Sequence, residues 1–386
     1  MRLLPFDYAV RNLGRSPRRL LGIVAGNVLV VLLIVAAAAF VDGMRGSLAQ
    51  RDDSRNVILL GAGSEESIER SEISAAVPGI LEASVPGIRT VQGEAFVSPE
   101  IVSALLLSSS PDREEELRAI VRGITPGAFL VHQRVEIVEG RAPRPGSGEV
   151  LAGSLAAEKM GLPSLPIGVK LWFDGEEWTV VGIMAARGSV MDAELWVPLP
   201  DLMLAMKRDS LSCVVVTLET AEFADLDAFT KMRLDLELAA IRESEYYAAV
   251  LRFYRPVQAM VWITAILVAA SGVLGGISTL YAAFASRVRE LGMLQALGYP
   301  RRAIAISLVQ EALLAAALAI IVALLLARLF LDGLAVSYSM GVFELAVGPR
   351  VVFAGAATGL ALGIIGALPP AWRCLRLPIP ESLKAT

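Results

Sequence analysis

The chain has 386 residues, of which 55% are hydrophobic and 19% are charged, and its mean hydropathy is +0.60. This composition is too apolar for one soluble domain and too charged for a protein that lies wholly in a membrane. We therefore expect membrane spans together with a water-exposed domain. The formal net charge of −4 constrains little, because the basic and acidic residues are unevenly distributed.

Several chemistries are excluded by residues that the sequence lacks. His132 is the only histidine, which rules out a zinc site of the HExxH type. The two cysteines, Cys213 and Cys374, provide neither a disulfide framework nor a cysteine metal site. No GxxxxGK(S/T) phosphate-binding loop and no GxSxG nucleophile motif occurs. We therefore expect no catalytic residue, metal or cofactor in this chain, and no nucleic-acid partner.

Residues 1–19 are basic, with five arginines and one acid. Their apolar side chains can form a helical stripe that lies in the membrane interface: Leu4, Phe6, Tyr8 and Leu13. The stretch could also be the n-region of a signal peptide. Against that, the apolar run at 20–41 reaches roughly 33 Å at about 1.5 Å per residue, enough to cross a bilayer, whereas a signal h-region has roughly 7–15 residues. We expect a cytosolic or interfacial basic helix, followed by the first transmembrane helix.

Residues 42–256 form a different kind of segment. From Asp42 to Arg255 there are 21 basic and 33 acidic residues, so the remainder of the chain is basic. By the positive-inside rule the arginine-rich ends face the cytosol and this segment lies outside, although a long domain translocates largely regardless of its charge. Strand-like runs and turns predict an α+β domain. The expected elements are a hairpin at 169–173 and 178–184, strands at 56–60, 195–197 and 213–218, and helices at 154–159 and 224–241.

Three further apolar spans follow, which gives four transmembrane helices and places both termini in the cytosol. The fold class is a polytopic α-helical membrane protein with a large α+β extracytoplasmic domain inserted between helices 1 and 2. The remaining segments are transmembrane helices at 257–285, 304–331 and 351–370, a cytosolic segment at 286–303, an external loop at 332–350 and a cytosolic tail at 371–386.

Few polar residues lie inside the spans. Ser271, Ser278 and Thr279 can bond to their own backbone, so the polar midplane of a secondary transporter is missing. Glu311 is the exception, about two turns into its span, where a carboxylate near the bilayer centre costs up to about 3 kcal/mol. It is either a proton or substrate site or an interfacial residue, which is paired with an arginine or caps the packing of a helix that protrudes into the cytosol. The lack of further polar residues favours the interfacial residue.

Glycines four residues apart recur in three of the spans. Spacing of this kind allows close helix contact, although glycine is also simply common in membrane helices. The positions are Gly22 and Gly26, Gly272 and Gly276, and Gly355, Gly359 and Gly363.

The segment SRVRELGMLQALGYPRRA, residues 286–303, lies between two spans. Apolar residues recur at every third position from Val288 to Leu297, which suits one face of a short helix. Gly298 predicts the end of that helix, and Pro300 predicts the start of the next. We expect the segment to present its apolar residues to a cytosolic partner: Leu291, Met293, Leu294 and Leu297. The alternative is an ordinary basic loop.

With Ile304 added, this stretch reads RVRELGMLQALGYPRRAI and resembles the cytoplasmic loop RxREIGxLRALGxxRxxI of MacB/FtsX/LolC-type permeases of ABC transporters. Gln295 replaces a usual basic residue, and Tyr299-Pro300 replaces two small or polar ones, which can alter the fit to the partner. YAVRNLGRSPRRLL near the N-terminus resembles the family's opening AxRNLxRxxxRTxL. The stretch 135–184 resembles the MacB-like periplasmic core.

The resemblance implies a non-catalytic permease subunit of a mechanotransmission-type ABC transporter in a bacterial plasma or inner membrane. It would couple ATP bound and hydrolysed by a separate cytosolic ATPase to movement of the external domain, for export or extraction of a substrate. A dimer with a second copy or a paralogue is implied, and a periplasmic adaptor protein is compatible. The residues assigned to ATPase coupling are Arg289, Glu290, Leu291, Gly292, Met293, Leu294, Ala296, Leu297 and Gly298.

A second function remains open within the same resemblance. The chain could be an FtsX-like membrane regulator or scaffold that controls an extracytoplasmic enzyme such as a cell-wall hydrolase. Its external domain of about 214 residues is larger than those proteins usually carry, which favours export or extraction.

Overall fold

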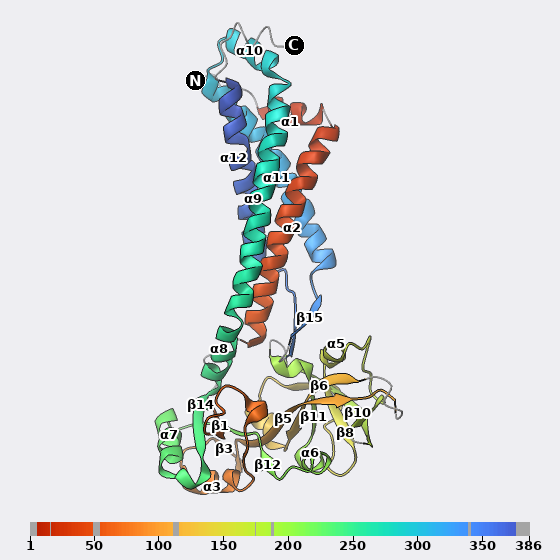
Figure 1. The fold of residues 1–386 in the computed structure, drawn as a ribbon, viewed down its shortest axis with the longest axis vertical. Coiled ribbons are helices and arrows are strands. Elements are labelled where there is room, and N and C mark those ends of the chain that lie inside the picture. The colour runs from red at the N-terminus through yellow and green to blue at the C-terminus, as the bar shows by residue number, and fades with distance from the viewer. Residues whose placement is uncertain are drawn as a thin grey trace. The chain divides into compact units, whose positions relative to one another are not determined.

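A computed structural model describes residues 6–15, 17–48, 55–110, 116–173, 175–186, 189–338 and 341–375. The chain divides into two compact units, which Figure 1 labels by their helices and strands. The helical unit comprises Met1–Asp42, Pro256–Leu334 and Leu345–Thr386. The sheet unit comprises Gly43–Arg255 and Ala335–Glu344. Leu4, Asp174 and the tail beyond Leu375 lie outside the described residues.

The helical unit contains six helices in its described part: α1 (Phe6–Gly14), α2 (Pro17–Leu48), α9 (Arg255–Ala285), α10 (Val288–Ala296), α11 (Arg301–Phe330) and α12 (Pro349–Leu375). Four of these helices have stretches long and apolar enough to cross a membrane: Leu20–Ser47, Arg255–Ala285, Arg301–Phe330 and Pro349–Arg373. The predicted spans at 20–41, 257–285 and 351–370 lie inside these stretches, and the span predicted at 304–331 extends one residue beyond Phe330. In the described part of the basic N-terminal segment α1 ends at Gly14, and Pro17, which suits a first helical turn, begins α2.

The predicted glycine contacts form on α12 and are largely missing on α2. A Cβ added at Gly355 would lie 2.5 Å from Val35 Cγ2, and one at Gly359 would lie 2.5 Å from Ile320 Cγ1. These glycines therefore let α12 approach α2 and α11 closely. Gly22 and Gly26 have open space at that position, so spacing alone did not identify which glycines pack.

The sheet unit is built on a ten-stranded mixed sheet. Its strand order is β14-β1-β13-β5-β6-β11-β8-β10-β7, with β9 also paired to β10. The strands are β1 (Asn56–Gly61), β5 (Val97–Leu107), β6 (Leu117–Ile124), β7 (Glu136–Gly140), β8 (Glu149–Gly153), β9 (Lys170–Phe173), β10 (Glu176–Ala185), β11 (Glu194–Pro198), β13 (Cys213–Thr217) and β14 (Leu238–Arg242). β13 is buried at every position, as expected for an apolar run in the middle of a covered sheet.

Helices and short elements complete this unit. The helices are α3 (Val77–Ser84), α4 (Gly127–Val131), α5 (Ala156–Met160), α6 (Leu199–Met206), α7 (Phe223–Met232) and α8 (Glu243–Phe253), with 3-10 turns at Ile68–Arg70, Val190–Ala193 and Leu234–Leu236. Two-residue strands pair as β2 (Ile73–Ser74) with β12 (Ser210–Leu211), and β3 (Thr90–Val91) with β4 (Glu94–Ala95). The predicted α+β class is confirmed, but the helix expected over 224–241 ends at Met232 and gives way to strand β14.

A network of charged side chains is buried in the sheet unit. Arg122 donates to both carboxylate oxygens of Glu194 at 2.6 Å and also to Glu100. His132 Nε2 lies 2.7 Å from the other Glu100 oxygen. Burial raises the pKa of Glu100, but His132 and Arg122 outweigh that effect and lower the pKa to about 2. Burial lowers the pKa of His132, and Glu100 more than reverses this, so the pKa is raised above 6.5. Glu100 and His132 therefore favour each other's charged form.

The expected external loop at 332–350 contains a hairpin that joins the sheet unit. Strands β15 (Ala335–Tyr338) and β16 (Gly341–Glu344) pair with each other. Lys159 donates to the Tyr338 carbonyl, and the Tyr338 ring makes an edge contact with Tyr254 at 5.5 Å between centroids. The chain therefore passes between the two units four times.

Candidate coupling site

The predicted cytosolic segment forms a short helix with two well-defined ends. Gly298 has φ +90, and the amides of Gly298 and Tyr299 bond back to the carbonyls of Gln295 and Leu294 at 3.0 and 3.1 Å. These two bonds make a Schellman motif, in which only glycine adopts the left-handed position without strain. Pro300 is the N-cap of α11, so the following helix starts directly after the turn.

One face of α10 is covered by the chain itself. Val288 and Leu291 are buried among Phe284, Ile304 and Leu308 of the flanking helices. Leu291 is only 1% exposed. The expectation that Leu291 faces a partner is therefore wrong for this structure, because α9 and α11 fold back against that side. Leu294 is half-buried in the same cluster.

The opposite face of α10 is open. Met293 is 47% exposed and Leu297 is 72% exposed. Arg289 and Ala296 are exposed beside them, and the spacing of these four residues at i, i+4, i+7 and i+8 places them on one side of the helix. We call Arg289, Met293, Ala296 and Leu297 the open face. Two exposed apolar residues at adjacent turns are a surface that a protein partner can cover.

A buried polar cluster fixes α10 to two other helices. Arg287, the N-cap of α10, donates from Nη1 to the Glu311 carboxylate at 3.1 and 3.3 Å. Asn12 of α1 donates to Glu311 Oε2 at 2.5 Å. All three residues are less than 10% exposed. Glu311 is thus paired with an arginine, the second of its two sequence interpretations, and α1 is tied to the start of the coupling segment through it.

Arg287 has a second, more exposed acidic partner. Its Nε donates to Glu290 at 3.3 Å, and Glu290 lies 4.0 Å from Arg15. Burial alone would lower the pKa of Arg287, but the Glu311 carboxylate raises it, so the guanidinium stays charged. Asn12 had not been singled out in the sequence. An amide on the buried side of an otherwise amphipathic helix is the signal that could have identified it.

Three hydroxyl side chains of α9 bond to their own helix. Ser271, Ser278 and Thr279 donate to the carbonyl oxygens four residues earlier at 3.0, 3.1 and 2.9 Å, as predicted. Among the described side chains, no group of three or more histidine, cysteine, aspartate or glutamate residues is arranged to hold a metal ion.

Residues 20–231 match the MacB-like periplasmic core domain, and residues 262–379 match the FtsX-like permease C-terminal domain. The chain belongs to the MacB/FtsX-type permease family. Together the two matches include α10, its flanking helices and most of the sheet unit. As a MacB/FtsX-type permease, it is a membrane subunit of the ABC-transporter class.

Two solved structures are similar to about half of the chain. The periplasmic region of MacB from Actinobacillus actinomycetemcomitans is 12% identical, with a TM-score of 0.39, and the match covers 54% of this chain and 96% of that one. The extracellular domain of the noncanonic ABC-type transporter YknZ from Gram-positive bacteria is 18% identical, with a TM-score of 0.38, and the match covers 48% and 100%. No curated protein matches the chain.

Proposed function

We propose that this permease works by mechanotransmission. ATP binding and hydrolysis in a separate cytosolic ATPase would move α10, and the long helices would carry that motion to the sheet unit outside the membrane. A substrate or partner there would be exported or extracted. The observation that carries this proposal is the open face of α10. The opposite side of the same helix is fixed to α9 and α11.

The attachment of α10 suits the transfer of force. A rigid turn joins it to α11, and the buried Arg287–Glu311 pair ties its first residue to the same helix. α9 and α11 have 31 and 30 residues, so each is roughly 45 Å long at about 1.5 Å per residue. A displacement of α10 must therefore move the ends of two helices that are long enough to cross a bilayer.

The arrangement across the membrane follows from charge. Arginines concentrate at the N-terminus and around α10, whereas the segment Asp42–Arg255 is acidic. The positive-inside rule then places both termini and α10 in the cytosol and the sheet unit outside. The proposed partners are the cytosolic ABC ATPase, a second permease copy or paralogue and the surrounding bilayer, and an external adaptor is compatible with the large sheet unit.

The open face is tested by comparing two equally exposed leucines. Leu297→Asp replaces an apolar contact worth about 1.5–3 kcal/mol and places an unpaired charge in the interface. Leu204→Asp is the matched control, because Leu204 is 73% exposed and lies in the sheet unit. Tagged permease is purified from its native membrane, and co-purified ABC ATPase and ATP hydrolysis are measured at equal permease levels.

The wild type and Leu204→Asp are expected to retain the ATPase and its activity, and Leu297→Asp is expected to lose at least nine-tenths of both. The chain has no phosphate-binding loop, so any hydrolysis must come from the partner. Full retention of the ATPase by Leu297→Asp would refute the proposed docking surface.

A further inference from the structure

A cavity in the sheet unit has features of a small-molecule site that the coupling mechanism does not use. Its volume is about 420 Å³, within the range of roughly 300–1,000 Å³ that is usual for ligand pockets. It is lined from β1, the α4–β7 loop, β13 and the start of α8, which are far apart in the sequence. Sequence patterning could not reveal it, because the lining residues meet only in the folded sheet.

The floor of this cavity is buried and fixed by hydrogen bonds. Thr217 Oγ1 donates to Asn56 Oδ1 at 2.7 Å, and Asn56 Nδ2 donates to Glu243 at 2.8 Å and to the Val131 carbonyl at 3.4 Å. Asn56, Thr217 and Glu243 are all less than 10% exposed. The floor is therefore rigid and already satisfied, so a ligand would be recognised mainly by the side chains around it.

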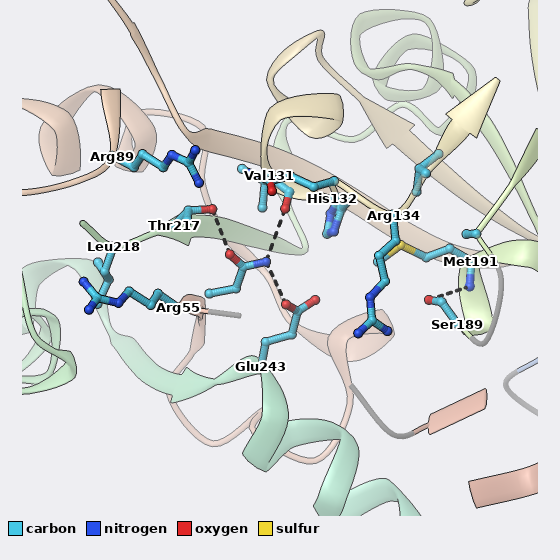
Figure 2. A pocket seen from close by; sticks show the side chains of 14 residues that line it. Arg55, Arg89, Val131, His132, Arg134, Ser189, Met191, Thr217, Leu218 and Glu243 are labelled. Atoms are coloured by element: carbon cyan, nitrogen blue, oxygen red, sulfur yellow. Dashed lines mark hydrogen bonds between the residues drawn. The ribbon is translucent and has the colours of Figure 1, made fainter. Parts of the chain in front are cut away.

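Three arginines surround this floor: Arg55, Arg89 and Arg134. Figure 2 shows Arg89 on one side and Arg134 on the other side of the hydrogen-bond chain that runs from Thr217 to Glu243. Arg89 stacks on the Phe96 ring at 4.6 Å, which holds the guanidinium in place without neutralising it.

None of these arginines has an acidic partner among the described residues. Arg55 donates to the backbone carbonyl of Glu219, and Arg134 makes neither a hydrogen bond nor an ion pair within that part of the chain. Elsewhere in this acidic unit, several basic side chains form ion pairs with acidic ones. Examples are the pairs Arg141–Glu149, Lys231–Asp227, Arg233–Asp235 and Arg242–Glu245.

The cavity is thus lined by three arginines and by one buried carboxylate, that of Glu243. His132 also lines it, but its ring nitrogen is paired with Glu100. A cleft with an excess of one sign concentrates the opposite ion. Guanidinium groups bind the oxygens of phosphate through paired, charge-assisted hydrogen bonds. Val131 and Met191 add apolar surface beside them, which suits an ester better than a bare ion.

We propose that this cavity binds a phosphate ester through Arg89 and Arg134, with Arg55 adding positive charge at its edge. The phosphate is either that of a free small molecule or that of a lipid headgroup. The site is independent of the proposed ATPase coupling, because none of its residues lies on α10 or its flanking helices.

The test uses the full chain in a neutral detergent and isothermal titration calorimetry. The probes are glycerol phosphate as a free ester and dihexanoylphosphatidylglycerol as a lipid ester, with inorganic phosphate as the bare ion. The variants are Arg89→Ala and Arg134→Ala, and Arg118→Ala is the matched control, because Arg118 is an exposed arginine of the same unit outside the cavity.

Binding of either ester is expected to weaken at least tenfold in Arg89→Ala and in Arg134→Ala, and to stay within twofold in Arg118→Ala. If only the lipid ester binds, the phosphate that the cavity recognises is that of a lipid headgroup. If the free ester binds and displaces the lipid, one site accepts both kinds of ester. No binding of either ester at millimolar concentration, or an equal loss in Arg118→Ala, would overturn the proposal. A change in melting temperature of a variant without ligand identifies a folding defect, in which case Arg89→Lys and Arg134→Lys replace the alanine variants.

Discussion

The buried pair of Arg287 and Glu311 provides a sharp test of how the coupling segment is held. Glu311→Ala removes the carboxylate from both Arg287 and Asn12, so the guanidinium loses its buried counter-ion and keeps only the more exposed Glu290, and a buried amide loses its acceptor. Breaking a buried ion pair in this way costs about 3–5 kcal/mol. For a unit of this size that corresponds to a fall in melting temperature of roughly 10 °C.

The assay is heating of the full-length chain in detergent, followed by size-exclusion chromatography of the fraction that remains monodisperse. Glu290→Ala is the matched control, since Glu290 bonds to the same arginine at 3.3 Å but is more exposed. An exposed pair contributes about 0–1 kcal/mol, so its melting temperature should change little. The double variant Arg287→Met with Glu311→Leu leaves no unpaired charge and should be more stable than Glu311→Ala alone.

Two results would refute this reasoning. If Glu311→Ala and Glu290→Ala melt at the same temperature, the burial of Glu311 contributes nothing to the pair. If the double variant melts at a lower temperature than Glu311→Ala, the stability lost in Glu311→Ala does not arise from an uncompensated charge.

Three further predictions concern topology, pH and helix packing. A cysteine introduced as Leu204→Cys should react with a membrane-impermeant maleimide in intact cells, and Arg301→Cys should react only after permeabilisation; the reverse pattern would contradict the proposed orientation. The sheet unit should be most stable between about pH 4.5 and 6.5. The pKa of Glu100 is lowered in the folded protein, so protonation of Glu100 removes stability as the pH falls toward 2. The pKa of His132 is raised in the folded protein, so deprotonation of His132 removes stability as the pH rises through that pKa. Melting curves of His132→Gln should lack the decline at higher pH that is expected for the wild type. Gly359→Ala should lower the melting temperature of the helical unit, because its Cβ would lie 2.5 Å from a neighbouring side chain, whereas Gly22→Ala has open space and should be neutral or slightly stabilising.

The helical unit could be predicted well because its signals are local. An apolar run of about 20 residues predicts a spanning helix whatever surrounds it. The segment around α10 was also accessible, since Gly298 and Pro300 fix the end of one helix and the start of the next through backbone chemistry alone. The partner of Glu311 could be predicted only as a type of residue, because Arg287 lies 24 positions away and Asn12 lies 299 away.

The sheet unit was predicted less completely because its strand order depends on pairing between strands that are far apart in the sequence. Strands β5 and β6 lie at the centre of the sheet, and neither was among the predicted strands. β14 was mistaken for helix, since the run LAAIR is compatible with either structure and only its pairing with β1 decides it. Membership of β15 and β16 in the sheet unit also follows from tertiary contacts such as Lys159 to Tyr338.

The error over Leu291 shows what a periodic pattern can and cannot establish. Spacing at every third residue predicts an apolar face, but it does not identify what covers that face. In α10 the side chains of Val288 and Leu291 are covered by α9 and α11, so these two residues hold the helix in place. The apolar residues left for a partner lie on the opposite, open face of the helix, at Met293 and Leu297. A helix that transmits movement needs both faces. If it bound only the partner, it could move without moving its own transmembrane helices. If it packed only against its own helices, the partner could not displace it. The two apolar sides of α10 therefore agree with a helix that both receives and transmits movement.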